Sequence, residues 1–191
     1  MTKAVVLIEP QIPENTGFIA RLCSNYEYEL RLVNPEFNLS ECRDTAVNAQ
    51  KVLEDATIFE SLDKGIEDLD FVVGTKPGRG TSVDEFQPRE NTSIVFGRED
   101  SGLSNEELEK CDAVIHLNVP GYSSLNLSHA AGIMMYSFTF REEGKNLDSG
   151  QIGFLKKLVG DNLISDLILR GSPTKEEFER VVGEIKKLKN S

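Results

Sequence analysis

The chain has 191 residues with a formal net charge of −11, and this acidic balance argues against a general nucleic-acid-binding surface. No apolar run approaches the roughly 20 residues that span a bilayer, and the N-terminus is too short for a signal peptide, so we expect a cytoplasmic protein with no membrane contact. Cys23, Cys42 and Cys111 form no CxxC pair, which indicates free thiols rather than a zinc site or a disulfide framework.

Strand-like and helical patterns alternate in the first part of the chain. Short apolar runs predict buried strands at Ala4–Ile8, Leu30–Val33 and Ala56–Phe59. Asn15 is placed to cap a first helix, whose apolar face would be formed by Ile19, Leu22, Cys23 and Tyr26. A helical stretch is predicted around Asp44–Leu53, and a short helix at Ser61–Glu67.

The alternation continues through the middle of the chain. We expect three more strands, at Phe71–Val73, Ser93–Phe96 and Ala113–Leu117, with a helix over Ser104–Lys110 between the last two. A longer helix follows, with apolar residues at helical spacing at Leu127, Ala130, Ala131, Met134 and Phe138. This order predicts an α/β domain with a mainly parallel sheet.

The C-terminal part has a different composition. Residues 144–150 are rich in glycine and small polar residues, which is typical of a linker. Beyond them, Ile152–Leu158 and Asn162–Leu169 are helix-like, and a capping box at Thr174–Glu177 opens an amphipathic helix. Residues 150–191 also carry a net charge of +2, whereas residues 1–149 carry −13. We therefore expect a domain at 1–143, a linker at 144–150 and a short helical extension at 151–191.

Three segments place polar residues and glycines at the expected ends of strands and starts of helices. They read NTGFIAR at 15–21, IVFGREDSG at 94–102 and HLNVPGYSSLNLSHA at 116–130. The last is a strand–loop–helix junction, which can present backbone N–H groups to a ligand. Each segment alone is a weak signal, but in this order and spacing they resemble the signatures of the SPOUT superfamily of RNA methyltransferases. The closest match is to its TrmH (SpoU) family, in particular to the TrmJ subgroup.

The resemblance implies a fold and an activity. The fold would be a SPOUT-type parallel sheet with a C-terminal deep trefoil knot, assembled as a homodimer. The activity would be transfer of a methyl group from S-adenosyl-L-methionine to a ribose 2′-hydroxyl. The expected target is anticodon-loop position 32 of a tRNA. A tRNA wobble position, an rRNA, or a non-catalytic relative that binds cofactor or RNA are the alternatives. A generic nucleotide-binding protein is disfavoured because neither G-x-x-x-x-G-K-[ST] nor G-x-G-x-x-G occurs.

The resemblance also assigns site residues. Arg21 would stabilise the developing alkoxide and an RNA phosphate, because an arginine side chain stays protonated at neutral pH. The other expected catalytic residues are Asn15, Glu99, Ser124 and Asn126, and the expected RNA-binding residues are Arg21, Arg79 and Ser124. The expected cofactor-binding residues are Gly74, Thr75, Gly97, Glu99, Leu117, Val119, Pro120, Leu125 and Asn126. No metal site is indicated.

Most of these residues have a structural alternative. Asn15 and Ser124 could simply cap helices, and Arg21 could form a surface salt bridge. Glu99 could be a solvated loop carboxylate beside Asp100. Lys76 and Arg79 could form a basic spot that faces RNA, or they could belong to an ordinary surface loop. For Leu127 we favour plain core packing over contact with the cofactor.

Overall fold

The computed structural model describes residues 2–89, 91–121 and 125–140, and the single positions 179, 182, 183, 185 and 187. The chain divides into two compact units, Met1–Arg141 and Glu142–Ser191. The first unit contains the helices and strands named below. The expected linker at 144–150 and most of the expected extension at 151–191 lie outside the described residues.

The first unit is built on a parallel sheet with the strand order β3-β2-β1-β6-β4-β7-β5. All pairings between these strands are parallel, as the sequence predicted. The short strand β5 was not expected, because two residues leave no periodic pattern. The strands are β1 (Ala4–Ile8), β2 (Glu29–Val33), β3 (Thr57–Phe59), β4 (Phe71–Thr75), β5 (Thr81–Ser82), β6 (Thr92–Phe96) and β7 (Ala113–His116).

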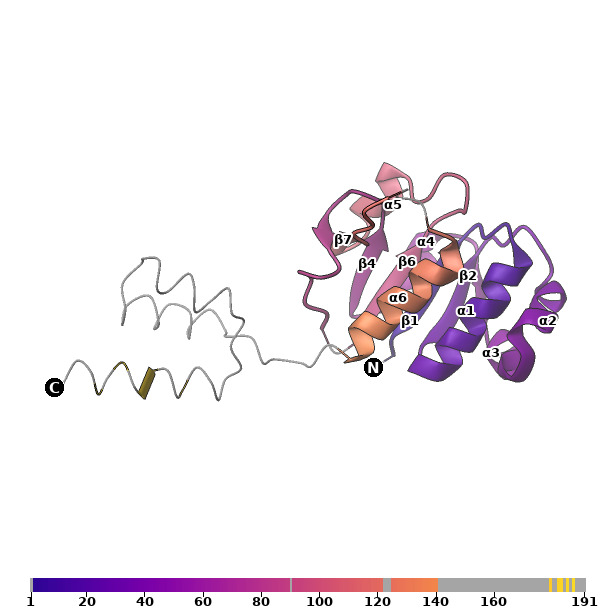
Figure 1. Cartoon of the computed structure of the whole chain (residues 1–191). Helices are drawn as coiled ribbons and strands as arrows, with labels where there is room; N and C mark the ends of the chain where they lie inside the picture. The colour runs from indigo at the N-terminus through magenta and orange to yellow at the C-terminus, as the bar shows by residue number, and fades with distance from the viewer. Residues whose placement is uncertain are drawn as a thin grey trace. The chain divides into compact units, whose positions relative to one another are not determined.

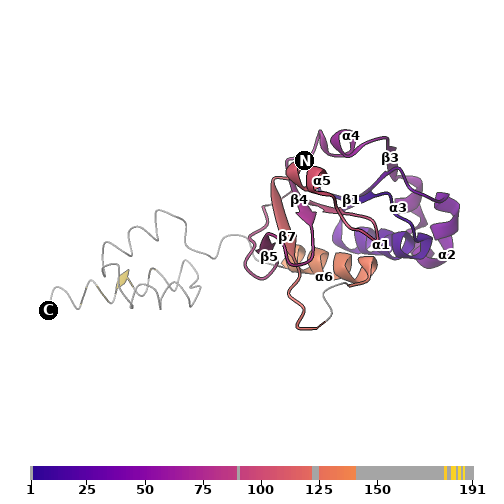
Figure 2. The ribbon, with the colours of Figure 1, turned by 90° about the horizontal axis from the view of Figure 1, so that it is seen from above.

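Helices cover both faces of the sheet (Figures 1 and 2). On one face α1 (Pro13–Tyr26) and α6 (Leu127–Phe140) lie side by side, and α2 (Arg43–Ala46) and α3 (Gln50–Glu54) pack against α1. On the other face lie α4 (Leu62–Ile66) and α5 (Asn105–Glu109).

Strand β1 shows why its sequence is apolar at every position. Val5 and Leu7 pack into the core beneath α1 and α6, whereas Val6 and Ile8 pack into the core on the side of α4 and α5. A strand that is buried on both faces has no solvent-facing position, so the usual alternation of apolar and polar residues disappears.

The start of α1 differs from the prediction. Ile12 occupies the N-cap position without a side-chain hydrogen bond, and Pro13 opens the helix. Proline suits the first helical position because its φ is already helical and it has no N–H group to leave unsatisfied. Asn15 therefore lies inside the first turn, and its prediction as the N-cap is wrong.

The helical stretch predicted around Asp44–Leu53 is present, but it is interrupted rather than continuous. A 3₁₀ turn, η1 (Leu39–Cys42), leads into α2, and a second one, η2 (Val47–Ala49), separates α2 from α3. The break falls at Val47, whose φ of 49° and ψ of −111° are unfavourable for a β-branched residue.

Candidate active site

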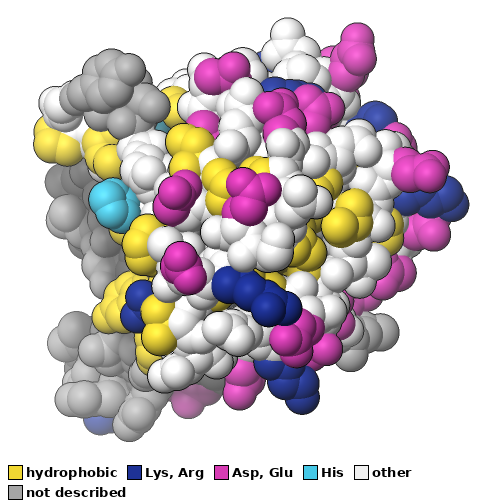
Figure 3. Space-filling model, turned by 90° about the vertical axis from the view of Figure 1, so that its right-hand side faces the viewer, with side chains coloured by type: hydrophobic (Ala, Val, Ile, Leu, Met, Phe, Trp, Pro, Cys, Tyr) yellow, Lys and Arg dark blue, Asp and Glu magenta, His cyan; other side chains and the backbone are white. Residues whose placement is uncertain are grey.

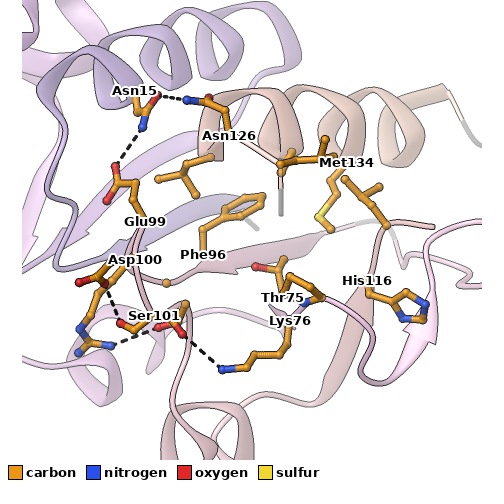
Figure 4. Close-up of a pocket in the computed structure, with 18 of the residues that line it drawn as sticks. Asn15, Thr75, Lys76, Phe96, Glu99, Asp100, Ser101, His116, Asn126 and Met134 are labelled. Atoms are coloured by element: carbon orange, nitrogen blue, oxygen red, sulfur yellow. Dashed lines mark hydrogen bonds between the residues drawn. The ribbon is translucent and has the colours of Figure 1, made fainter. Parts of the chain in front are cut away.

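A cavity of about 510 Å³ opens at the carboxyl ends of β4, β6 and β7 (Figure 4). This is the edge of a parallel α/β sheet at which ligands usually bind. Its wall includes residues from all three signature segments. The first segment contributes Asn15, the second contributes Gly97 and Glu99, and the third contributes Leu125 and Asn126.

The cavity wall combines apolar side chains with a similar number of polar and charged ones. The apolar side chains belong to Ile12, Pro77, Phe96, Leu117, Leu125, Leu127, Ala130 and Met134. The polar and charged side chains belong to Asn15, Thr75, Lys76, Arg98, Glu99, Asp100, Ser101, His116 and Asn126. Such a wall can hold a ligand that is part apolar and part charged.

Hydrogen bonds join the three signature segments at one side of the cavity (Figure 4). The Asn15 side chain is buried; its Nδ2 donates to Glu99 Oε1 at 3.2 Å, and its Oδ1 accepts from Asn126 Nδ2 at 2.9 Å. Asn126 Oδ1 in turn accepts hydrogen bonds from the backbone N–H of Ser128 at 2.9 Å and from Ser128 Oγ at 2.7 Å. Because both ends of the Asn15 amide are engaged, its orientation is fixed.

Glu99 supplies the capping group that α1 lacks locally. Its Oε2 accepts from the backbone N–H of Gln11 at 2.9 Å, and its Oε1 accepts from that of Ile12 at 3.4 Å. A carboxylate there also interacts favourably with the positive end of the helix. Glu99 is thus not the freely solvated carboxylate of the alternative interpretation, because it fixes both the start of α1 and Asn15.

The loop after β6 is held by an ion-pair network. Arg98 Nε donates to Glu9 at 2.6 Å, and its terminal nitrogens donate to Glu107 at 3.1 and 3.2 Å. The hydrogen bonds to Glu9 and Glu107 raise the pKa of Arg98. Burial pushes the pKa of Glu107 upward, but its hydrogen bonds with Arg98 and Ser104 outweigh this and leave it lowered. The loop wall of the cavity is therefore charged but internally paired.

Two glycines allow this loop to close tightly. A Cβ on Gly97 would overlap the backbone of Gly102, so the close approach of these two positions requires glycine. Gly102 has a φ of 67°, and its N–H donates to the Arg98 carbonyl at 2.9 Å. Gly97 borders the cavity, as expected from the sequence, but its missing side chain serves the packing of the loop.

Two predicted cofactor-binding residues lie at the end of β4, but only one of them borders the cavity. Thr75 borders the cavity, and its Oγ1 donates to the Val95 carbonyl at 3.0 Å. Gly74 is buried and does not border it; a Cβ there would lie 2.9 Å from Cys111 Sγ on the α5 side. Gly74 therefore packs toward α5, and its assignment to cofactor binding stays a prediction.

Several predicted residues lie away from the cavity wall. Arg21 is exposed, and it forms no hydrogen bond or ion pair with any other residue that the structure describes, so the salt bridge of the alternative interpretation is not seen. Arg79 is also exposed, and its guanidinium donates to Asn105 Oδ1 at 2.5 Å. Val119 and Pro120 do not contribute to the wall, and Ser124 lies outside the described residues.

Other wall residues were not expected from the sequence. Arg98, Asp100 and Ser101 lie within the second signature, so their neighbours could have indicated them. Ala130 and Met134 follow Leu127 at helical spacing, and all three border the cavity; Leu127 also packs against the core, as predicted. His116 likewise opens the third quoted segment, whereas nothing in the sequence marked Ile12.

The cysteines are all free, as predicted, and Cys23 is buried. Burial raises the pKa of Cys42 to about 11 and that of Cys111 to about 12, so neither is a thiolate at neutral pH. Across the described residues no group of His, Cys, Asp or Glu side chains could hold a metal ion. No helix in that same part of the chain is long and apolar enough to cross a membrane.

Comparison with known proteins gives consistent matches. The profile of the SpoU rRNA Methylase family matches residues 2–136. The chain is 36% identical over 163 residues to the tRNA (cytidine-2′-O-)-methyltransferase TrmJ of Methanocaldococcus jannaschii, which covers 76% of this chain and 71% of that protein. It is 30% identical over 197 residues to the TrmJ of Sulfolobus acidocaldarius, covering 93% and 82%.

Solved structures have the same fold. A structure described as giving insights into "the 2-OH methylation of C/U34 on tRNA" aligns with a TM-score of 0.65 and 28% identity, over 71% of this chain and 92% of its own. The SpoU methyltransferase AviRb of Streptomyces viridochromogenes, solved in complex with AdoMet, aligns with a TM-score of 0.62 and 20% identity. That alignment covers 72% of this chain and 57% of AviRb, and it shows that the two proteins share a fold.

Proposed function

Because the chain belongs to the SpoU rRNA methylase family, we propose that it transfers a methyl group from S-adenosyl-L-methionine to a ribose 2′-hydroxyl of tRNA. The observation that carries this proposal is the hydrogen-bonded series Glu99–Asn15–Asn126, which brings one residue from each signature segment to the same cavity. No single segment could form this arrangement, since the three are far apart in the sequence.

The cavity suits S-adenosyl-L-methionine in size and chemistry. Its volume of about 510 Å³ falls in the range of roughly 300–1,000 Å³ that is usual for small-molecule sites. Phe96, Leu117 and Leu125 offer apolar surface to an adenine ring, and the charged side chains nearby suit an amino acid group. When bound, the cofactor supplies a methyl group that a positively charged sulfur has already activated.

The chain's own task is to prepare the ribose hydroxyl, which is a poor nucleophile until its proton leaves. We assign to Arg21 the stabilisation of the negative charge that develops on this oxygen and on an adjacent phosphate. Arg21 suits the role because its exposed guanidinium has no partner among the described residues. Asn15, Glu99 and Asn126 then act as positioning residues around the cavity.

Arg21 does not border the cavity of its own protomer, so the proposal includes a homodimer in which it serves the partner's cavity. The neighbouring helices α1 and α6 expose large apolar side chains that such an interface would cover. These are Phe18, Ile133, Tyr136 and Phe140, whose side chains are 42%, 46%, 57% and 62% exposed.

RNA binding must overcome the acidic surface of the domain. Figure 3 shows Asp and Glu side chains scattered over one face, with Lys and Arg only in separate places. We propose that Arg21, Arg79 and Ser124 contact the RNA locally. Anticodon-loop position 32 is our first choice of target. The wobble position is the second, because one structurally similar protein is described with C/U34 of tRNA; an rRNA, or a non-catalytic role, is the remaining alternative.

The proposal extends to topology and location. The chain would form the deep trefoil knot at the C-terminal end of residues 1–143. Two features support this. The described strand that precedes β7 in the sequence is β6, but β7 pairs with β4 instead. The helix that follows, α6, packs beside α1 near the start of the chain. We place the protein in the cytoplasm, where its tRNA substrate is found.

The test is a methyl-transfer assay with the purified chain, S-adenosyl-L-methionine and unmodified tRNA transcripts. Mass spectrometry of nuclease fragments should locate one 2′-O-methylated nucleotide in the anticodon loop. A transcript with a deoxyribose at that nucleotide is the matched control and should accept no methyl group. Cofactor binding without any transfer to tRNA or rRNA would identify a non-catalytic relative instead.

A further inference from the structure

Lys76 carries a charge that the proposed mechanism does not use. It follows β4, is half-buried and borders the cavity (Figure 4). Its Nζ donates to the carbonyl oxygens of Leu103 at 2.6 Å and Ser101 at 3.5 Å. Within the described residues it has no carboxylate partner.

Lys76 differs from Arg98 in having no partner of opposite charge among the residues that the structure describes. Arg98 is the other lysine or arginine of the cavity wall, and its charge is matched by both Glu9 and Glu107. Lys76 has only neutral carbonyl partners, although an ammonium has three hydrogens to donate. A partly buried charge without a counter-charge is unfavourable, so a group of opposite sign that enters the cavity would be stabilised there.

The cavity also leaves room beside this ammonium. Gly102 lies between Ser101 and Leu103 in this loop, and an added Cβ there would lie 3.9 Å from Lys76 Nζ. Because position 102 is glycine with a φ of 67°, no side chain projects toward the ammonium from there. A small anionic group therefore has access to Lys76 from the cavity.

We propose that Lys76 binds the carboxylate of the amino acid part of S-adenosyl-L-methionine. The inference rests on the proposed function, because it takes that cofactor as the ligand. The carboxylate is the cofactor's one anionic group, while its sulfonium and its amino group are positive. The same cavity wall carries Glu99 and Asp100, so it offers groups of both signs to a ligand with both.

The experiment compares two ligands in two proteins by calorimetry, using the full chain. One ligand is S-adenosyl-L-methionine, and the other is its decarboxylated form, which lacks only the carboxylate. In Lys76→Met the affinity for the complete cofactor should fall about ten- to hundred-fold, as expected for loss of a hydrogen bond between charged groups. The affinity for the decarboxylated form should be the same in both proteins, and Lys76→Arg should retain most of the binding.

Lys64→Met is the matched control, because it removes the same charge from α4, outside the cavity. It should leave both affinities unchanged. Equal weakening of both ligands in Lys76→Met would mean that Lys76 only holds the Ser101–Leu103 loop, and would overturn the proposal. Unchanged affinity for the complete cofactor in Lys76→Met would also overturn it. If tRNA binding were weaker in that variant, Lys76 would be assigned to an RNA phosphate instead. If the wild-type chain binds neither ligand, it is the cofactor assignment itself that fails.

Discussion

At the scale of single residues, Asn15 and Glu99 show how a signature residue can have a role different from the one its pattern indicates. Asn15 looked like a helix cap because asparagine precedes an apolar helical pattern. The helix begins earlier, and the capping comes from Glu99, 84 residues further along the chain. Local propensity cannot reveal a partner at that separation, whereas the signatures predicted a shared site for both residues, and both border the cavity.

Arg21→Ala tests the residue to which we assign the chemistry. We expect methyl transfer to fall about 10²–10³-fold, as when one group that stabilises a developing oxyanion is removed. Cofactor affinity should stay within about twofold, since Arg21 does not border the cavity of its own protomer. Radiolabelled methyl transfer and calorimetry measure the two. Arg43→Ala, another exposed arginine, is the control, and a near wild-type rate in Arg21→Ala would remove Arg21 from the mechanism.

Glu107 gives a prediction about pH. Its pKa is lowered in the folded protein, so its ionised form stabilises the fold above the unfolded pKa of about 4.3, and this contribution is lost as the pH falls below that value. Glu107→Gln should lower the unfolding free energy by about 1–3 kcal/mol at pH 7 and by much less at pH 3. Urea unfolding at both pH values measures this. The same deficit at pH 3 and pH 7 would contradict it, and Glu109→Gln is the exposed control on α5.

At the scale of helices and strands, the sequence predicted the sheet better than the helices. Each buried strand is an apolar run that needs no partner to be recognised, and the alternation with helices implied parallel pairing. The segment α2–η2–α3 was predicted as a helical stretch, but its interruption was not, because Val47 fits a helical pattern and a β-branched residue disfavours a positive φ. Its conformation depends on how this segment packs against α1, where a Cβ on Gly17 would overlap Thr45.

Val47→Gly should therefore stabilise the domain. The conformation at Val47 costs of order 1–3 kcal/mol for a residue with a Cβ, while glycine adds an entropic cost of about 1 kcal/mol. The valine side chain is 50% exposed, so little burial is lost. We expect a gain of about 1 kcal/mol by thermal or urea unfolding. Val47→Ala keeps the Cβ and should gain less; a glycine variant less stable than the alanine variant would show that Val47 is not strained.

At the scale of the whole molecule, the exposed apolar face of α1 and α6 predicts a dimer. Light scattering at micromolar concentration should give twice the chain mass of 21.3 kDa. Tyr136→Glu places a charge on this face and should shift the protein to monomers that bind the cofactor but transfer methyl groups poorly, because Arg21 would no longer reach a second cavity. Glu60→Gln, which changes charge on a different surface, should stay dimeric. A wild-type monomer would contradict the shared site.

The charge distribution leads to a prediction for residues 150–191, which carry a net charge of +2 against −13 for residues 1–149. We expect this extension to help hold tRNA against the repulsion of an acidic domain, so a chain ending at residue 149 should fold, bind the cofactor normally and lose salt-dependent tRNA affinity. Filter binding at two salt concentrations separates this from the alternative, in which Phe178, Val181, Ile185 and Leu188 complete a dimer core. In that case the shortened chain would aggregate. Because the salt dependence of binding counts the phosphates that are neutralised, a shortened chain with the full salt slope and full methylation would assign RNA binding to residues 1–149 alone.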